Sequence, residues 1–152
     1  MEEYSIIGKR IPRVDAREKV TGQAKYAADY SLPDMLWCKL LRSPYPHARI
    51  LNIDTSKAQK LSGVKAVVTD KDFGGWKWGW MATTRDEPPV AVDKVRYMAE
   101  AVAGVAAIDE DIAEEATELI KVDYEVLQGV FEPEESMKEG ATKIHDYVKN
   151  NI

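Results

Sequence analysis

The sequence predicts an α+β fold built from mixed short strands and two main helices. The clearest observation is a strand–helix–strand unit in the second half: an apolar run at 101–108, a helical pattern at 111–120 and an alternating segment at 121–127. A second observation is a series of short apolar and β-branched segments in the first half. The length of 152 residues fits one ordinary domain and leaves little room for another.

The chain begins with a segment, residues 1–23, that we expect to be an extended arm. Pro12 removes a backbone donor there and Gly22 permits a turn. Strands are expected at 24–30 and 36–42, joined by a turn at 31–34. The second of these strands is apolar on both faces, which predicts a central position in a sheet.

Three further elements are expected before the middle of the chain. They are a strand at 49–53, a short helix capped by Asp54 or Thr55 and ended by Gly63, and a strand at 64–69. Between the strands at 36–42 and 49–53, two prolines within residues 43–47 prevent ladder hydrogen bonds and predict a rigid corner.

The helix at 111–120 has its own start signal. Asp111 and Glu114 have the N-cap to N3 spacing of a capping box. Acidic residues also crowd this end of the helix, where the helix dipole favours negative charge. Apolar side chains recur at helical spacing on one side: Ile112, Ala113, Ala116, Leu119 and Ile120.

Composition excludes several classes of function. Apolar residues make up 45% and charged residues 31%, as in a soluble globular protein, and the net charge of −5 argues against nucleic acid as a partner. No signal peptide and no run of 18 apolar residues occurs, so we expect no membrane segment and a cytoplasmic location. One Cys and two His cannot assemble an iron–sulfur cluster or the usual Cys/His zinc site.

Charge is distributed unevenly along the chain. Residues 1–76 hold 13 Lys and Arg against 9 Asp and Glu, whereas residues 77–152 hold 8 against 17. Two interpretations of the basic arm stay open: a solvated segment, or a segment that docks on an acidic partner surface. The basic residues concerned are Lys9, Arg10, Arg13, Arg17 and Lys19.

The sequence contains no strong catalytic or metal-binding pattern. No phosphate-binding glycine motif is present. Ser43 and His47 resemble a nucleophile and base only in their proximity, so we expect a structural role for His47. His145 with Asp146, and the acids before the helix, lack metal-site spacing. Cys38 lies mid-strand among apolar residues and is expected to be buried and inert.

The most unusual stretch places three tryptophans, Trp76, Trp78 and Trp80, among glycines. Their alternation would put them on one face of an extended segment. Three interpretations stay open: they cover the edge of this domain's own core, they dock to a partner or second domain, or they contact a ligand.

Several motifs, in this order and spacing, resemble the xanthine dehydrogenase and aldehyde oxidase family of molybdenum hydroxylases. The resemblance covers about residues 7–147. The motifs are GKRIPRVD at 8–15, EKVTGQAKY at 18–26, RSPYPHARI at 42–50, IDTSKA at 53–58, GVKAV at 63–67, DKVRY at 93–97, AEEA at 113–116 and VDYE at 122–125.

This resemblance is to the N-terminal α/β hammerhead domain of the molybdopterin-binding large subunit. It implies an arm at 1–23, the hammerhead domain at 24–147 and the start of a linker at 148–152, leading to an absent molybdopterin-binding region. It also implies a non-catalytic domain, inactive alone, that helps wall the substrate channel and assemble the subunits. No catalytic, cofactor-binding or metal-binding residue is carried over.

The cofactors implied for the full enzyme are molybdopterin with molybdenum, iron–sulfur clusters and FAD. The implied partners are the molybdopterin-binding region and the iron–sulfur and FAD domains or subunits, with no nucleic acid or membrane. The tryptophan segment lies where family members vary, so we expect Trp76, Trp78 and Trp80 to face a neighbouring domain or the route to the active site.

One departure from the family pattern concerns the turn after Arg96-Tyr97. Where the family has Gly-x-Pro-Val-Ala, this chain has AEAVA at 99–103, which leaves the tightness of that turn open. Two alternatives for function also remain. AIDE at 107–110 and KVDYEVL at 121–127 are similar to the 4-hydroxybenzoyl-CoA reductase branch of the family. The second alternative is a stand-alone adaptor or small-molecule-binding module of the same fold. A natural reading frame that continues past Ile152 would argue against this alternative.

Overall fold

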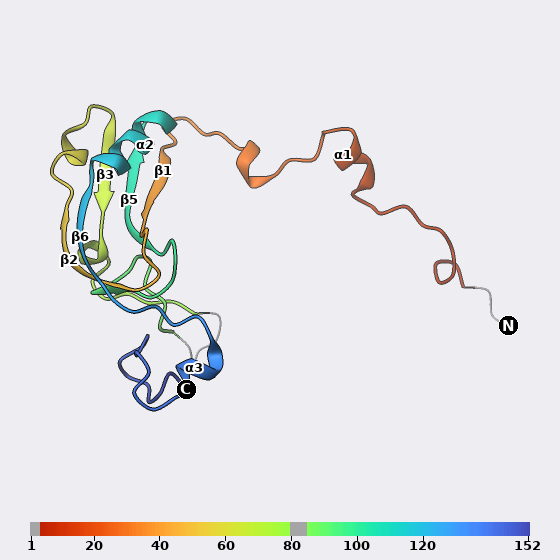
Figure 1. The fold of residues 1–152 in the computed structure, drawn as a ribbon. Helices are drawn as coiled ribbons and strands as arrows, with labels where there is room; N and C mark the ends of the chain where they lie inside the picture. Colours follow the sequence, from red (N-terminus) through yellow and green to blue (C-terminus); the bar gives the residue numbers. More distant parts are fainter. Residues whose placement is uncertain (1–3, 80–84) are drawn as a thin grey trace. The chain divides into compact units, whose positions relative to one another are not determined.

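The structure is a computed structural model that describes residues 4–79 and 85–152. The chain divides into two compact units, Met1–Met35 and Leu36–Ile152 (Figure 1).

The first unit is a largely irregular segment with two short helical pieces. They are α1 at Ala16–Val20 and a 3₁₀ turn, η1, at Ala27–Asp29. The strand predicted at 24–30 is therefore wrong. The Asp29 carboxylate accepts a hydrogen bond from the Tyr26 N–H at 2.9 Å, and this local bond closes a turn in place of an extended strand. None of residues 4–35 is buried.

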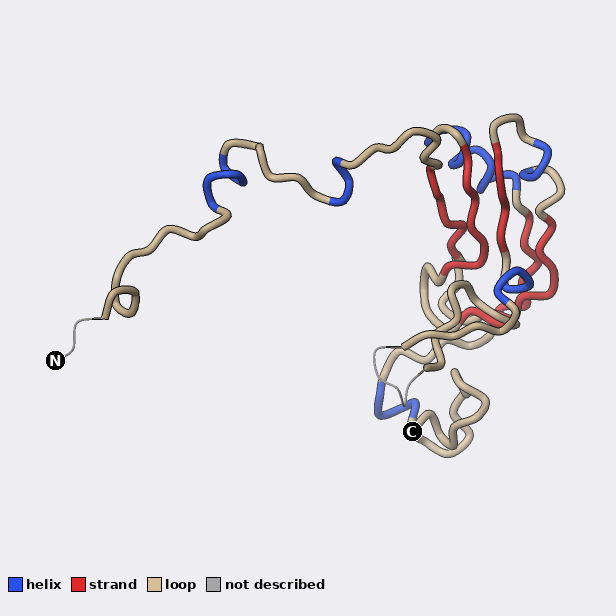
Figure 2. Tube along the Cα trace, turned by 180° about the vertical axis from the view of Figure 1, so that it is seen from behind, coloured by secondary structure: helices blue, strands red, loops and turns tan. Residues whose placement is uncertain are grey.

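The second unit contains two three-stranded sheets in which every described pairing of named strands is antiparallel (Figures 1 and 2). The first has the order β1-β5-β3, from Trp37–Arg42, Ala101–Ala107 and Val64–Val68. The second has the order β4-β2-β6, from Lys94–Val95, Ala48–Asp54 and Lys121–Val126. These strands confirm the predicted segments at 36–42, 49–53, 64–69, 101–108 and 121–127.

The position predicted for β1 is wrong, because β1 is an edge strand and β5 is central. One face of this sheet is covered by α2, Glu110–Leu119, and the face of β1 that carries Cys38 is not. Cys38 is consequently exposed, which corrects the expectation of a buried thiol. Apolar residues on both faces of β1 thus do not indicate burial on both faces.

The start of α2 lies earlier than predicted. Asp109 is the N-cap, and its carboxylate accepts hydrogen bonds from the N–H groups of Asp111 at 2.9 Å and Ile112 at 3.4 Å. Asp111 therefore belongs to the first turn and is not the cap. Asp109 and Asp111 are both possible N-caps by residue type, so the pattern located the helix but not its first residue.

The remaining helical elements are short. In the described residues they are the 3₁₀ turns η2, Ala58–Lys60, and η3, Asp70–Phe73, and the four-residue helix α3, Pro133–Ser136. The helix predicted before Gly63 is reduced to η2, because Asp54 accepts the N–H of Ser56 at 2.9 Å and forms a turn first.

Strand β5 connects two hydrophobic clusters. Ala103 and Val105 pack with Ala116 of α2 in the first cluster, and Val102 packs with Val95 in the second. Gly104 lies between Leu40 and Val68, and a Cβ there would stand 3.4 Å and 3.2 Å from their side chains. This close approach explains the small residue at the centre of the sheet.

None of the helices in the described part of the chain has the length and hydrophobicity that a membrane crossing requires.

Candidate functional site

The tryptophan segment leaves η3 through a tight turn and runs at the surface. Gly74 and Gly75 both have positive φ, and the Trp76 N–H closes the turn on the Phe73 carbonyl at 2.9 Å. Trp78 then exchanges two backbone hydrogen bonds with Glu87, at 2.9 and 3.1 Å. The segment is therefore held by its backbone, which leaves its side chains available for other contacts.

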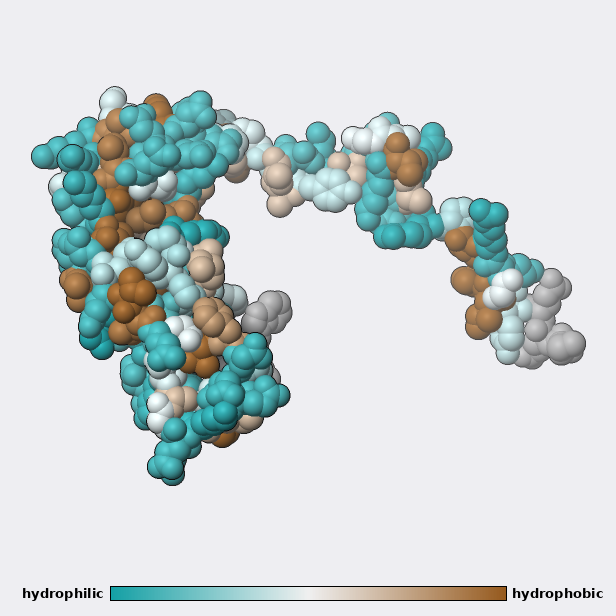
Figure 3. Space-filling view, in the orientation of Figure 1, coloured by the Kyte–Doolittle hydropathy of each residue, from teal (hydrophilic) through white to brown (hydrophobic). Residues whose placement is uncertain are grey.

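The two described tryptophans are exposed. The exposed fraction is 60% for Trp76 and 43% for Trp78, and neither belongs to a core cluster. Trp80 lies outside the described residues. Figure 3 shows further hydrophobic side chains that reach the surface between hydrophilic ones. Independently of the figure, the exposed large hydrophobic residues of the second unit include Phe131, Tyr147, Tyr97 and Met98.

The Ser43–His47 corner is structural. The Ser43 hydroxyl accepts the Tyr45 N–H and donates to the Tyr45 carbonyl, both at 3.0 Å. The buried His47 ring has Nδ1 2.9 Å from the Gln128 carbonyl, so Nδ1 donates there. The Ser43 hydroxyl and the His47 Nδ1 are thus occupied by the backbone, in line with the structural role expected for His47. The buried His47 Nε2 has no hydrogen-bond partner among the described residues, so it does not pair with Ser43 as a base would.

A cluster of charged groups connects β4 with the C-terminal segment. The buried Lys94 ammonium lies 3.2 Å from Oδ1 and 3.1 Å from Oδ2 of Asp146, and 3.3 Å from the Lys143 carbonyl. The hydrogen bond from Lys94 holds the pKa of Asp146 below its usual value. Burial, with a contribution from Arg96, lowers the pKa of His145. Lys94 thus neutralises Asp146 in a structural contact.

The turn at 96–100 has an unusual backbone. Ala99 has a φ of +63°, its N–H donates to the Ser43 carbonyl at 3.2 Å, and its carbonyl accepts from Arg42 at 2.9 Å. The buried Glu100 carboxylate accepts the Arg96 N–H, and burial raises the pKa of Glu100. The turn therefore has the left-handed backbone that glycine favours, although alanine occupies the position.

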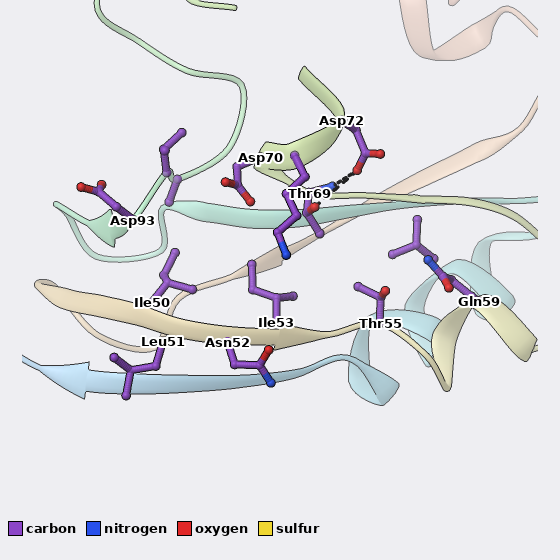
Figure 4. A pocket seen from close by; sticks show the side chains of 14 residues that line it. Ile50, Leu51, Asn52, Ile53, Thr55, Gln59, Thr69, Asp70, Asp72 and Asp93 are labelled. Atoms are coloured by element: carbon purple, nitrogen blue, oxygen red, sulfur yellow. Dashed lines mark hydrogen bonds between the residues drawn. The ribbon is translucent and has the colours of Figure 1, made fainter. Parts of the chain in front are cut away.

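A pocket of about 500 Å³ lies between β2 and the end of β3 (Figure 4). Ile50 and Ile53 point into it from β2, and Asp70 points toward them from η3. Leu51 and Asn52 lie on the other side of β2. The pocket thus combines an apolar floor with a charged rim.

The residues present do not fit a metal ion or an iron–sulfur cluster held by the described part of this chain alone. Within 4–79 and 85–152, no three His, Cys, Asp or Glu side chains are grouped so that they could hold a metal ion. The single Cys of the chain cannot supply the several thiolates of an iron–sulfur cluster.

The buried Lys94 and Glu100, and the pocket, were not predicted from the sequence. Lys and Glu are normally surface residues, so nothing in their local pattern indicates burial. The altered turn motif at 99–103 was the one available signal near Glu100. The pocket is assembled from segments that are separate in the sequence, which no local pattern reveals.

Comparison with known proteins gives a consistent result. Residues 21–128 match the family model for the aldehyde oxidase and xanthine dehydrogenase a/b hammerhead domain. The large molybdopterin subunit of nicotinate dehydrogenase from Eubacterium barkeri is 43% identical over 144 residues, which are 95% of this chain and 34% of that subunit. A probable xanthine dehydrogenase subunit from Bacillus subtilis is 47% identical over 135 residues, 88% of this chain and 18% of that subunit.

Solved structures agree with these relatives. The quinoline 2-oxidoreductase from Pseudomonas putida 86 superposes with a TM-score of 0.82 at 34% identity, over 93% of this chain and 19% of that one. The chain thus spans between about a fifth and a third of the length of these relatives. It belongs to the aldehyde oxidase and xanthine dehydrogenase family, as the α/β hammerhead domain of that family.

Proposed function

We propose that this chain is a non-catalytic domain of a molybdenum-dependent hydroxylase or dehydrogenase, where it helps wall the substrate channel and assemble the subunits. Its named relatives are molybdopterin subunits and dehydrogenase subunits several times longer than the matched region. The full enzyme would supply molybdopterin, iron–sulfur clusters and FAD from its other regions.

The observation that carries the proposal is the exposure of Trp76 and Trp78. A tryptophan side chain loses a large favourable transfer free energy when it stays in water. Two exposed tryptophans on a segment held by backbone hydrogen bonds favour contact with a neighbouring domain, because aromatic residues are enriched at protein interfaces. Trp80, the next residue in the alternation, is proposed to share this role.

The test replaces both described tryptophans by serine in the purified chain. Because their side chains lie outside both core clusters, Trp76→Ser with Trp78→Ser is expected to raise solubility and leave the midpoint of thermal unfolding within about 2 °C. Trp37→Ser is the control, since Trp37 is also about half exposed but lies in β1. A loss of stability in the double variant larger than in the control would place the tryptophans in this domain's own core and contradict the proposal.

A further inference from the structure

The pocket between β2 and β3 borders two strand edges that no strand of the described residues pairs with. β4 pairs with β2 at Ala48 and Arg49, and the Ile50 N–H donates to the Asp93 carbonyl at 2.7 Å. Beyond this bond, residues 51–54 have no partner strand on that side in the described part of the chain. β3 is the end strand of its sheet. Residues of β2 and β3 line the pocket, and residues of β5 and β6 do not. β5 pairs with β3 and β6 pairs with β2, so the pocket does not lie on these paired sides.

Open strand edges are places where another chain can pair. An unpaired edge presents a row of N–H and C=O groups, and proteins normally cover such an edge or blunt it with charge, proline or a bulge. Strand addition by an extended peptide uses these groups for affinity and side-chain pockets for selectivity. The β2–β6 pairing has a register shift between Ile50 and Asn52, as a bulge gives, and no described strand pairs with the opposite edge of β2 beyond that point.

The side chains around the pocket define what kind of segment fits. Ile50, Ile53 and Val67 give an apolar floor. The rim carries three carboxylates against one ammonium group: Asp70, Asp72 and Asp93 against Lys71. A partner with apolar side chains for the floor and cations for the rim is therefore complementary in shape and in charge.

Two of the rim carboxylates are fixed by internal contacts, and the third is positioned to meet a ligand. Asp72 accepts the Thr69 N–H at 2.7 Å, and Asp93 pairs with Arg96 at 3.1 Å. Asp70 points across the pocket toward Ile50 and Ile53. Asp70 is thus the carboxylate best placed to select a cation on an incoming segment.

We propose that this groove binds an extended segment of a partner protein in which apolar residues alternate with Lys or Arg, added as a strand along the free edge of β2. The volume of about 500 Å³ fits a few side chains of such a segment. The inference goes beyond the proposed function and does not depend on the tryptophan segment.

The test titrates the ¹⁵N-labelled full chain with the capped peptide Lys-Val-Arg-Val-Lys and, separately, with Glu-Val-Glu-Val-Glu. Only the basic peptide is expected to give saturable shifts, centred on residues 50–54 and 67–72. The amides of 51–54 should also exchange more slowly with solvent when it is bound. Asp70→Asn should weaken the affinity about fivefold, as expected for one partly exposed charge contact.

The matched control is Glu115→Gln, which removes one charge from α2 away from the pocket and should leave the affinity unchanged. Shifts centred on α2 would show attraction to acidic side chains in general and overturn the inference. No binding, equal binding of both peptides, or an unchanged affinity in Asp70→Asn would overturn it as well.

Discussion

Replacing Ala99 with glycine is expected to stabilise this chain. Ala99 has a φ of +63°, in the left-handed region where a Cβ crowds the following carbonyl group. The backbone is held there by the hydrogen bonds of Ala99 with Ser43 and Arg42. Glycine keeps both bonds and removes the crowding.

The magnitude follows from two opposing effects. The left-handed conformation costs a non-glycine residue about 1–2 kcal/mol. Glycine offsets part of the gain, because its greater freedom in the unfolded chain costs about 0.4–1 kcal/mol. We therefore expect Ala99→Gly to raise the free energy of unfolding by about 0.5–1 kcal/mol, which for this chain length is a rise of about 1–4 °C in the midpoint of thermal unfolding.

The assay is chemical and thermal unfolding followed by circular dichroism. The matched control is Ala66→Gly, because Ala66 is an exposed residue of β3 whose φ is not positive. The control is expected to lose about 0.5–1 kcal/mol. If Ala99→Gly destabilised the chain as the control does, the turn at 96–100 would not be strained and the expected gain would be refuted.

Three further results are expected. Asp109→Ala should lower the free energy of unfolding by about 1 kcal/mol through loss of the α2 cap, whereas Asp111→Ala should change it by less than half as much. Equal losses of unfolding free energy in urea titration would argue against Asp109 as the cap. Cys38 should react with a thiol reagent in the folded chain as fast as in the denatured one, and a protected thiol would contradict its exposure. Lys94 lowers the folded-state pKa of Asp146, so their contact stabilises the chain above the ordinary Asp pKa, and this stabilisation is lost as pH falls through the lowered value. Asp146→Asn should therefore reduce the loss of unfolding free energy as the pH falls through this range, and an unchanged pH dependence would refute this linkage.

Much of the fold was predictable because its signals are local. The apolar run at 101–108 and the alternation at 121–127 gave β5 and β6, and the helical spacing between them gave α2. The wrong predictions concern features that depend on the packing of one element against another and not on a local pattern. Apolar residues on both faces of β1 indicated a central strand, yet the covering helix lies on one face only.

The candidate site was predictable only in part. The tryptophan segment was recognisable from composition, and Trp76 and Trp78 are exposed. Their contact with a neighbouring domain stays a prediction. The pocket and the burial of Lys94 depend on contacts between distant segments, such as the 52 positions that separate Lys94 from Asp146. Side chains brought together in this way leave no periodic pattern in the sequence.

The proposed assembly of this chain against a molybdenum-binding region can be measured in a chimera. In it, residues 7–147 replace the matching region of the Eubacterium barkeri nicotinate dehydrogenase large subunit, coexpressed with the rest of that enzyme. The chimera is expected to retain molybdenum and nicotinate oxidation, and Trp76→Ser with Trp78→Ser in it should reduce both several-fold, while the isolated chain shows no turnover. Full molybdenum content and activity in the tryptophan variant, or turnover by the isolated chain, would contradict the proposed role.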